Sequence, residues 1–114
     1  MQIHQSAEDY LETILMLTQR MGKVRSIDVV NELGFTKASV SIAMKKLREN
    51  GYIAVDGEGN LTLLEPGREI AERIYSRHRL LTHFFVQLGV DEKTAAEDAC
   101  KAEHILSEQT LEKI

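Results

Sequence analysis

Apolar residues near the start of the chain recur at the spacing of an amphipathic helix. The residues that share its face are Tyr10, Leu11, Ile14, Leu15 and Leu17. Ser6 stands where an N-cap is expected and Gly22 ends the run, so the pattern predicts a first helix between them. A shorter apolar pattern from Ser26, its expected N-cap, to Gly34 predicts a second helix.

A third helical pattern follows the second after a very short turn. Thr36 is its expected N-cap, and the pattern continues through Asn50. One side of this helix is apolar, whereas the other carries lysines and serines. Two helices joined by a tight turn that contains glycine, the second of them basic, are typical of a helix-turn-helix. The third helix is therefore the predicted DNA-reading helix.

Two strand-like runs come next, Tyr52–Val55 and Leu61–Leu64, separated by the turn-rich sequence Asp56–Asn60. This arrangement predicts a β-hairpin, which would form the wing of a winged helix. Pro66 suits the first turn of a long fourth helix that Gly89 ends.

Two further helices are expected towards the end of the chain. Asp91 is the predicted N-cap of a fifth helix that reaches about Leu106, and Ser107 is that of a short last one. The predicted fold class is mainly α with a small β-hairpin wing. We expect a winged helix-turn-helix in residues 1–65, followed by a helical segment in residues 66–114.

The composition fits one folded domain of 114 residues with at most a short extension. Hydrophobic residues make up 43% and charged residues 28%, close to the average for globular proteins. No stretch approaches the roughly 18 apolar residues that span a bilayer, so we expect a cytoplasmic protein without a membrane partner. The single cysteine, Cys100, excludes an internal disulfide and is either a small buried hydrophobe or a metal ligand.

Charge is distributed unevenly, although the formal net charge is only -4. From Lys23 to Asn50, six basic and three acidic residues give +3. From Gly89 to Ile114, three basic and seven acidic residues give -4. Because phosphate contacts are local, the distribution matters more than the sum, and the two segments suit different partners.

The third helix offers a plausible surface for DNA. Its small side chains let the backbone approach base edges, and cations further along can reach phosphates. The candidate DNA-binding residues are Arg25, Thr36, Lys37, Ala38, Ser39, Ser41, Lys45 and Lys46. The alternative is a solvated basic helix on a winged helix that binds protein. The glycine-rich hairpin favours DNA.

Near the end of the chain, Cys100, Glu103 and His104 stand at i, i+3 and i+4, which on a helix places three potential metal ligands on one face. Thiolate, carboxylate and imidazole together favour a transition metal. The spacing alone is weak evidence, because a helix rich in glutamate often places a histidine beside one. Cys100 could equally be a core residue.

Other candidate ligands lie earlier in the chain. Asp9 and Glu12 are one turn apart on the first helix, although Asp9 could instead support the helix start and Glu12 could be a solvated charge. His78 lies on the apolar stripe of the fourth helix, where a core histidine is more common than a ligand.

These motifs together resemble a known family, the metal-dependent repressors named for the diphtheria toxin repressor and the manganese transport regulator. Residues 6–14, Ser-Ala-Glu-Asp-Tyr-Leu-Glu-Thr-Ile, resemble the opening of the family. Residues 36–51 are similar to its recognition helix, residues 77–81 to its linker-helix histidine segment and residues 100–107 to its metal-binding helix. The motifs occur in order over nearly the whole chain.

The resemblance implies a metal site. Asp9 matches a first-helix ligand that is aspartate in the manganese branch and methionine in the iron branch. Cys100 matches a position that is cysteine in the iron branch and a bridging glutamate in the manganese branch. Glu103 and His104 match ligands of both branches. The resemblance thus implies a site that is manganese-like at one position and iron-like at another.

It also implies roles for Glu12 and His78, which match the pair that completes a second ion site in the manganese branch. The iron branch has an ancillary site whose carboxylate and histidine are replaced here by Thr82 and Ala96, so we do not expect that site. Members of the family continue beyond the position of Ile114, with further helix or a small barrel domain, which leaves a natural short form or a fragment as alternatives here.

The resulting hypothesis is a repressor that senses Fe(II) or Mn(II), with Zn(II) or Co(II) as surrogates. It would bind double-stranded operator DNA as a homodimer, with residues 66–114 serving metal binding and dimerisation, and would act on no small-molecule substrate. One alternative is a metal-independent winged-helix regulator. A metallo-hydrolase is a weaker alternative, because the sequence lacks a His-Glu-x-x-His helix, a phosphate-binding glycine loop and a separate general base, so we do not expect an enzyme.

Overall fold

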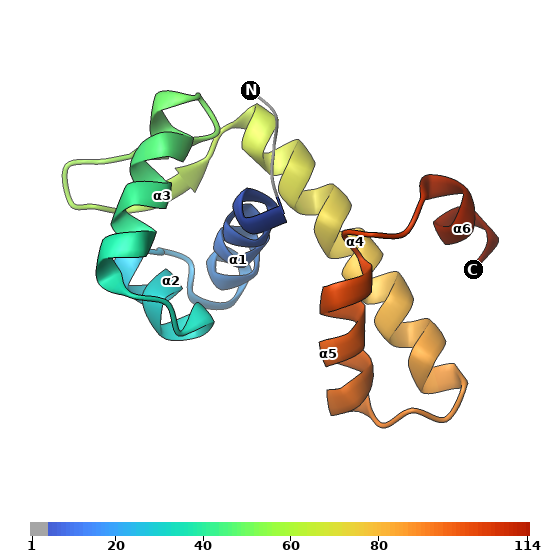
Figure 1. Ribbon diagram of the computed structural model, residues 1–114. Coiled ribbons are helices and arrows are strands. Elements are labelled where there is room, and N and C mark those ends of the chain that lie inside the picture. The colour runs from blue at the N-terminus through green and yellow to red at the C-terminus, as the bar shows by residue number, and fades with distance from the viewer. Residues whose placement is uncertain (1–4) are drawn as a thin grey trace. The chain divides into compact units, whose positions relative to one another are not determined.

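The computed structural model describes residues 5–114, with side chains from Ser6 onward, and is mostly helical (Figure 1). Its elements in chain order are α1 (Gln5–Met21), α2 (Ser26–Leu33), α3 (Lys37–Glu49), β1 (Ile53–Val55), β2 (Leu61–Leu63), α4 (Glu65–Gln87), α5 (Glu92–Ala102) and α6 (Glu108–Lys113). The chain forms two compact units that divide between Glu72 and Arg73, inside α4. No helix in the described range is both long and apolar enough to cross a membrane.

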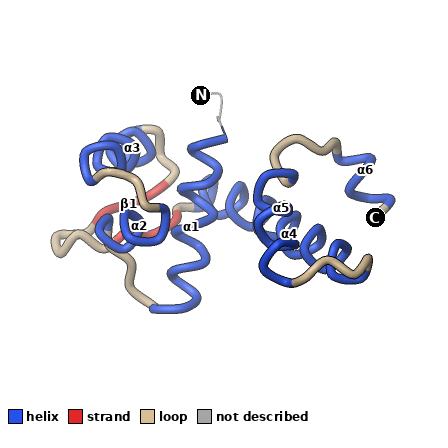
Figure 2. Tube along the Cα trace, turned by 60° about the horizontal axis from the view of Figure 1, so that its bottom comes forward, coloured by secondary structure: helices blue, strands red, loops and turns tan. Residues whose placement is uncertain are grey.

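The first unit is a winged helix-turn-helix, which confirms the predicted fold class. Strands β1 and β2 pair antiparallel, with Ile53 opposite Leu63 and Val55 opposite Leu61. Figure 2 shows this hairpin in red within the otherwise helical unit. Its second strand also pairs with the segment before α2, where the Leu61 N–H donates to the Val24 carbonyl at 2.7 Å. The wing is thereby fixed to the start of the helix-turn-helix.

Every helix and strand predicted for residues 1–65 contributes buried residues to the core of the first unit. Helix α1 contacts α2, α3 and β2, and α3 contacts α2 and β1. The most deeply buried apolar side chains are Leu11, Ile14, Val24, Val29, Val40 and Ile53, each at most 1% exposed. Burial of each side chain of this size contributes roughly 1.5–3 kcal/mol to folding. The apolar stripe of α3 thus faces inward and its polar side faces solvent.

Three of the N-cap predictions are confirmed by hydrogen bonds. The Thr36 hydroxyl accepts the Ser39 N–H at 3.1 Å at the start of α3. Asp91 caps α5 and Ser107 caps α6, each by accepting a backbone N–H three residues later at 3.2 Å. Each cap satisfies one of the N–H groups that a helix start leaves unpaired.

Two other caps were predicted wrongly. Helix α1 already includes Gln5, so Ser6 lies inside the helix. Helix α2 is capped by Arg25, because the Asp28 carboxylate accepts the Arg25 N–H at 2.9 Å. Ser26 is therefore the first helical residue, and its hydroxyl is available for other contacts.

Helix α4 begins at a close approach to the wing. A Cβ at Gly67 would collide with the Tyr52 carbonyl oxygen, which also accepts the Leu64 N–H at 3.0 Å. Only glycine allows the helix backbone to lie so close to the start of the hairpin. This contact fixes the start of α4 against the hairpin.

The second unit contains the rest of α4 with α5 and α6 around a small core. Its buried residues are Leu81, Ala99 and Leu111, with Phe85, Ala102 and Leu106 packed against them. The prediction that α5 extends to Leu106 is wrong, since the helix ends at Ala102. The chain turns there, which lets Leu106 and α6 pack back onto the same core.

Candidate metal and DNA-binding sites

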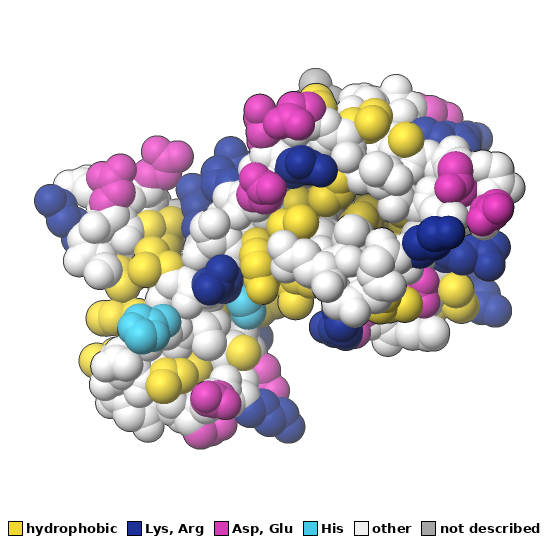
Figure 3. All heavy atoms as spheres, turned by 180° about the vertical axis from the view of Figure 1, so that it is seen from behind, with side chains coloured by type: hydrophobic (Ala, Val, Ile, Leu, Met, Phe, Trp, Pro, Cys, Tyr) yellow, Lys and Arg dark blue, Asp and Glu magenta, His cyan; other side chains and the backbone are white. Residues whose placement is uncertain are grey.

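The second unit holds a buried carboxylate between two imidazoles. The Glu103 side chain is 0% exposed. Its Oε2 lies 3.0 Å from Nδ1 of His78, and its Oε1 lies 3.4 Å from Nε2 of His104. The side chain of His104 is 2% exposed and that of His78 is 20% exposed. All the described histidines belong to this unit, and some of them are visible in cyan in Figure 3.

Backbone geometry fixes this cluster. Glu103 is the C-cap of α5, and its N–H donates to the Ala99 carbonyl at 2.9 Å. The Arg77 guanidinium donates to the Glu103 carbonyl at 3.3 Å and forms a 3.8 Å ion pair with Glu108 of α6. Arg77 therefore links three parts of the unit, which are α4, the turn that follows α5, and α6. This role was not predicted, and the only signal for it in the sequence is the place of Arg77 beside His78.

The donor set fits a divalent transition metal. A buried carboxylate is costly unless hydrogen bonds or positive charge compensate it. Among the described residues, Glu103 Oε1 receives no hydrogen bond, although His104 Nε2 lies close to it. Imidazole nitrogens beside a carboxylate oxygen are the ligand types that manganese, iron and zinc accept. The residues present therefore suit such an ion.

The predicted ligands lie on α1, on α4, on α5 and in the turn that follows α5. Helix α5 ends at Ala102, so Glu103, its C-cap, and His104 follow the helix directly, one turn after Cys100. Cys100 lies on α5 and is exposed.

In the first unit, α1 carries the two other acidic candidates. Glu12 is 5% exposed and Asp9 is half-buried, one helical turn earlier. The burial of Glu12 does not match the alternative of a solvated charge at that position.

The predicted DNA-binding side chains all lie on the surface of the first unit. All eight are exposed: Arg25, Thr36, Lys37, Ala38, Ser39, Ser41, Lys45 and Lys46. The buried side of α3 is formed by Val40, Met44 and Leu47. Two of the hydroxyls are already engaged, because Thr36 donates to the Ser39 Oγ at 2.8 Å. Ser41 and the lysines are therefore the more accessible polar groups.

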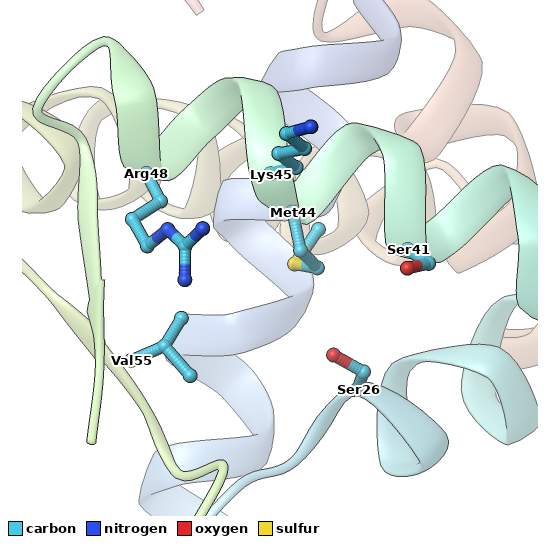
Figure 4. Close-up of a pocket in the computed structure, with 6 residues that line it drawn as sticks. All are labelled: Ser26, Ser41, Met44, Lys45, Arg48 and Val55. Carbon is cyan, nitrogen blue, oxygen red and sulfur yellow. The ribbon is translucent and has the colours of Figure 1, made fainter. Parts of the chain in front are cut away.

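A pocket of about 250 Å³ lies between α3, the start of α2 and β1 (Figure 4). Its lining residues are Ser26, Ser41, Met44, Lys45, Arg48 and Val55. In Figure 4 the Arg48 guanidinium and the Ser26 hydroxyl point into this space, whereas the Lys45 side chain extends away from it. Hydroxyls and cations around a hollow of this kind suit an anionic oxygen. Ser26 was predicted as a cap only, and Arg48 was not predicted as a functional residue.

The wing lies against Arg25, and hydrogen bonds within its turn stabilise it. The Arg25 guanidinium lies beside Gly59, where a Cβ would come within 3.4 Å of it. In the turn of the wing, the Asp56 carboxylate accepts the N–H groups of Glu58 and Asn60, each at 2.9 Å. Hydrogen bonds from Asn60 hold the pKa of Asp56 below its usual value of 3.8. Positive and negative side chains alternate over this unit in Figure 3.

A winged helix with an exposed basic α3, joined in one chain to a unit that holds a carboxylate between imidazoles, defines a class: DNA-binding proteins with a candidate metal centre. Two family models match the chain. The iron dependent repressor N-terminal DNA binding domain covers residues 2–61, and the iron dependent repressor metal binding and dimerisation domain covers residues 64–114. The chain belongs to the iron-dependent repressor family of metal-dependent transcriptional regulators.

Individual relatives agree with this membership. An HTH-type transcriptional regulator of Methanocaldococcus jannaschii is 38% identical over 96% of this chain and 90% of the relative. The HTH-type transcriptional regulator MntR of Bacillus subtilis is 34% identical over 96% of this chain and 77% of its own length.

Solved structures show the same fold. A manganese-dependent transcriptional repressor in complex with manganese has a TM-score of 0.85 at 29% identity, over 94% of this chain and 50% of that one. The manganese regulator SloR has a TM-score of 0.80 at 26% identity, over 99% of this chain and 52% of that one. The chain thus spans about half the length of these structures.

Proposed function

We propose that the protein is an Fe(II)- or Mn(II)-responsive repressor that binds operator DNA as a homodimer in the cytoplasm. DNA binding is assigned to residues 1–65, and metal binding and dimerisation to residues 66–114. The observation that carries the proposal is the buried carboxylate of Glu103 beside His78 and His104, in a chain that also has an exposed basic recognition helix. The proposal gives the chain no catalytic step.

His78, Glu103 and His104 are the proposed ligands of the second unit. A bound divalent ion would supply positive charge that neutralises the buried Glu103 carboxylate. Arg77 keeps the Glu103 backbone in place, so that the carboxylate stays aligned with the two imidazoles. Both imidazoles must offer a lone pair to the ion, so acidification weakens binding by proton competition.

Asp9, Glu12 and Cys100 are the further proposed ligands. The support for Asp9 and Glu12 is the motif that they share with the family and the partial or full burial of their carboxyl groups. Their oxygens favour manganese, whereas the thiolate of Cys100 favours softer ions such as ferrous iron, zinc or cobalt. Related structures contain manganese and, for the regulator ScaR, Zn²⁺. We therefore expect manganese and ferrous iron to compete for the same residues.

On the DNA side, α3 is proposed to lie in the major groove. The pocket of Ser26, Ser41 and Arg48 beside it is proposed to receive a phosphate oxygen of the duplex backbone. A two-fold dimer presents two recognition helices, which must match major-groove sites roughly 34–36 Å apart. Metal binding that favours this arrangement raises DNA affinity, and by linkage DNA raises metal affinity by the same factor.

The test is DNA binding by the purified protein to promoter fragments of its genome, titrated with Mn(II), with anaerobic Fe(II), with Zn(II) and with chelator. Wild-type protein is expected to bind only with metal. Glu103→Gln, which removes the buried charge at nearly the same volume, is expected to abolish the metal response. Glu97→Gln provides the matched control, since Glu97 is an exposed glutamate of the same helix.

Equal binding with metal and with chelator would contradict the proposal and support a metal-independent regulator. Retention of the metal response in Glu103→Gln would remove Glu103 from the ligand set. Cys100→Ser and Cys100→Glu then test the softer ligand separately, because replacement by a carboxylate is expected to shift the preference towards manganese.

A further inference from the structure

The recognition helix carries a large apolar side chain where the fold does not need one. Ile42 is 58% exposed, more than any other large hydrophobic residue described in the first unit. A β-branched residue is also a weaker helix former than the alanine or lysine that would suit an exposed position. Neither core packing nor helix propensity therefore accounts for isoleucine here.

Ile42 occupies the middle of the outward face of α3. At 3.6 residues per turn it points away from the buried stripe of Val40, Met44 and Leu47. One turn earlier on the same face is Ala38, whose small side chain leaves space beside Ile42. The outermost part of the helix is therefore apolar over two successive turns.

Polar groups flank this apolar centre on both sides. Ser41 and Lys45 line the pocket of Figure 4 on one edge of α3. Ser39 and Lys46 line a second pocket, of about 300 Å³, on the other edge, and Ile42 also lines it. A helix with an apolar centre and two cationic edges is suited to a groove whose floor has apolar groups and whose two walls are phosphates.

The C5 methyl of thymine is the apolar group that base pairs present in the major groove. We propose that Ile42 contacts a thymine methyl and so makes the protein select a thymine at one position of each half-site. The inference rests on the proposed DNA-binding function and names the chemical group that α3 reads. The restricted χ1 of isoleucine means that little side-chain entropy is lost on contact.

The experiment begins with the duplex that wild-type protein selects from a random library in the presence of Mn(II). Each thymine of that duplex is then replaced singly by deoxyuridine, which keeps base pairing but lacks the methyl. For wild-type protein, replacement at one position per half-site is expected to weaken binding about fourfold, the value of one buried methyl group. At that position Ile42→Ala should bind thymine and uracil duplexes equally well.

A matched control is Met21→Ala, which removes a side chain that is 50% exposed but lies outside α3. This variant should keep the full thymine preference. A second variant, Ile42→Val, keeps a branched apolar side chain and is expected to keep most of it. Wild type and Ile42→Ala, each with the thymine and the deoxyuridine duplex, form a double-mutant cycle. The cycle measures the coupling energy between the side chain and the methyl group, and a general loss of affinity cancels out of it.

The outcomes separate the two proposals. No selection of any duplex by wild-type protein would overturn both. Specific binding in which deoxyuridine costs the same for wild type and Ile42→Ala would overturn the role of Ile42 and leave the DNA-binding function intact. A thymine preference that disappears only when Ile42 is truncated supports the proposed contact between Ile42 and the thymine methyl.

Discussion

The two units differ in how far neighbouring residues determine their functional surfaces. In the first unit, the residues of α3 that are proposed to face DNA lie on one helix whose cap, apolar stripe and polar face are all local features. In the second unit, His78 and Glu103 are 25 residues apart and meet only because α4 and the end of α5 pack together. A surface formed by one helix can be predicted from the periodicity of the sequence. A site formed by residues far apart in the sequence depends on how the helices pack.

Each unit has its own core, and core truncations test this independence most strongly. Leu11→Ala in the first unit and Leu81→Ala in the second remove side chains that are 0% exposed. Each should lower the free energy of unfolding by about 2–5 kcal/mol, measured by urea denaturation. Hydrogen exchange should show that Leu81→Ala lowers the protection of α5 and α6 more than that of α2 and α3.

Leu88→Ala is the control, because Leu88 is 66% exposed and its truncation should change stability little. A uniform loss of protection over the whole chain in Leu81→Ala would contradict the separation into two units.

The junction between the wing and α4 should be the next most sensitive position. Gly67→Ala introduces a Cβ against the Tyr52 carbonyl oxygen, so the backbone must shift. We expect a loss of about 1–3 kcal/mol, although alanine is the better helix former. Thermal unfolding measures the change. Gly57→Ala is the matched control, because a Cβ at Gly57 would meet nothing within 4 Å. A stabilised Gly67→Ala protein would contradict the close approach.

Arg77 contacts the turn that carries Glu103 and His104, and we expect it to hold this turn in place. Arg77→Gln removes the hydrogen bond to the Glu103 carbonyl and the ion pair with Glu108. Loss of groups that orient metal ligands typically costs about 10-fold or more in affinity. Calorimetric titration with Mn(II) should show a weakening of this size. Lys101→Gln, an exposed cation on α5, should bind as wild type does. Equal affinities of the two variants would mean that the turn holds without Arg77.

The smallest effect is expected at the tip of the wing. The folded protein holds the pKa of Asp56 below 3.8, so its hydrogen bonds stabilise the wing above pH 3.8. This stability is lost as the pH falls through the lowered folded value. Asp56→Asn should therefore be less stable than wild type near neutral pH and approach it in acid, as measured by urea unfolding at several pH values. A constant difference would show that the carboxylate charge is not involved.

Much of the molecule could be predicted because its signals are local. Thr36, Asp91 and Ser107 were identified as caps from residue type and position, and hydrogen bonds confirm all three. The cap of α2 was predicted at Ser26 but is Arg25, because Asp28 reaches back to the Arg25 N–H and moves the helix start by one residue. Periodicity located the buried side of α3, including Val40 and Met44.

The candidate sites were predicted in part. The sequence identified Glu103 and His104 as potential ligands but placed them on a continuing helix with Cys100. It named His78 through family resemblance and could not show that its Nδ1 lies 3.0 Å from a fully buried carboxylate. Arg48 and Ser26 were missed because they share a pocket only after α2, α3 and β1 pack together.

By itself the sequence determined the helices, the hairpin, the apolar faces and the family, since each depends on residues within a few positions or on ordered motifs. Tertiary structure alone decided where α5 stops, that Arg77 braces the turn after it, and that Glu103 is buried between His78 and His104. The physical reason is that burial and ligand geometry arise from contacts between residues distant along the chain, which local patterns do not specify.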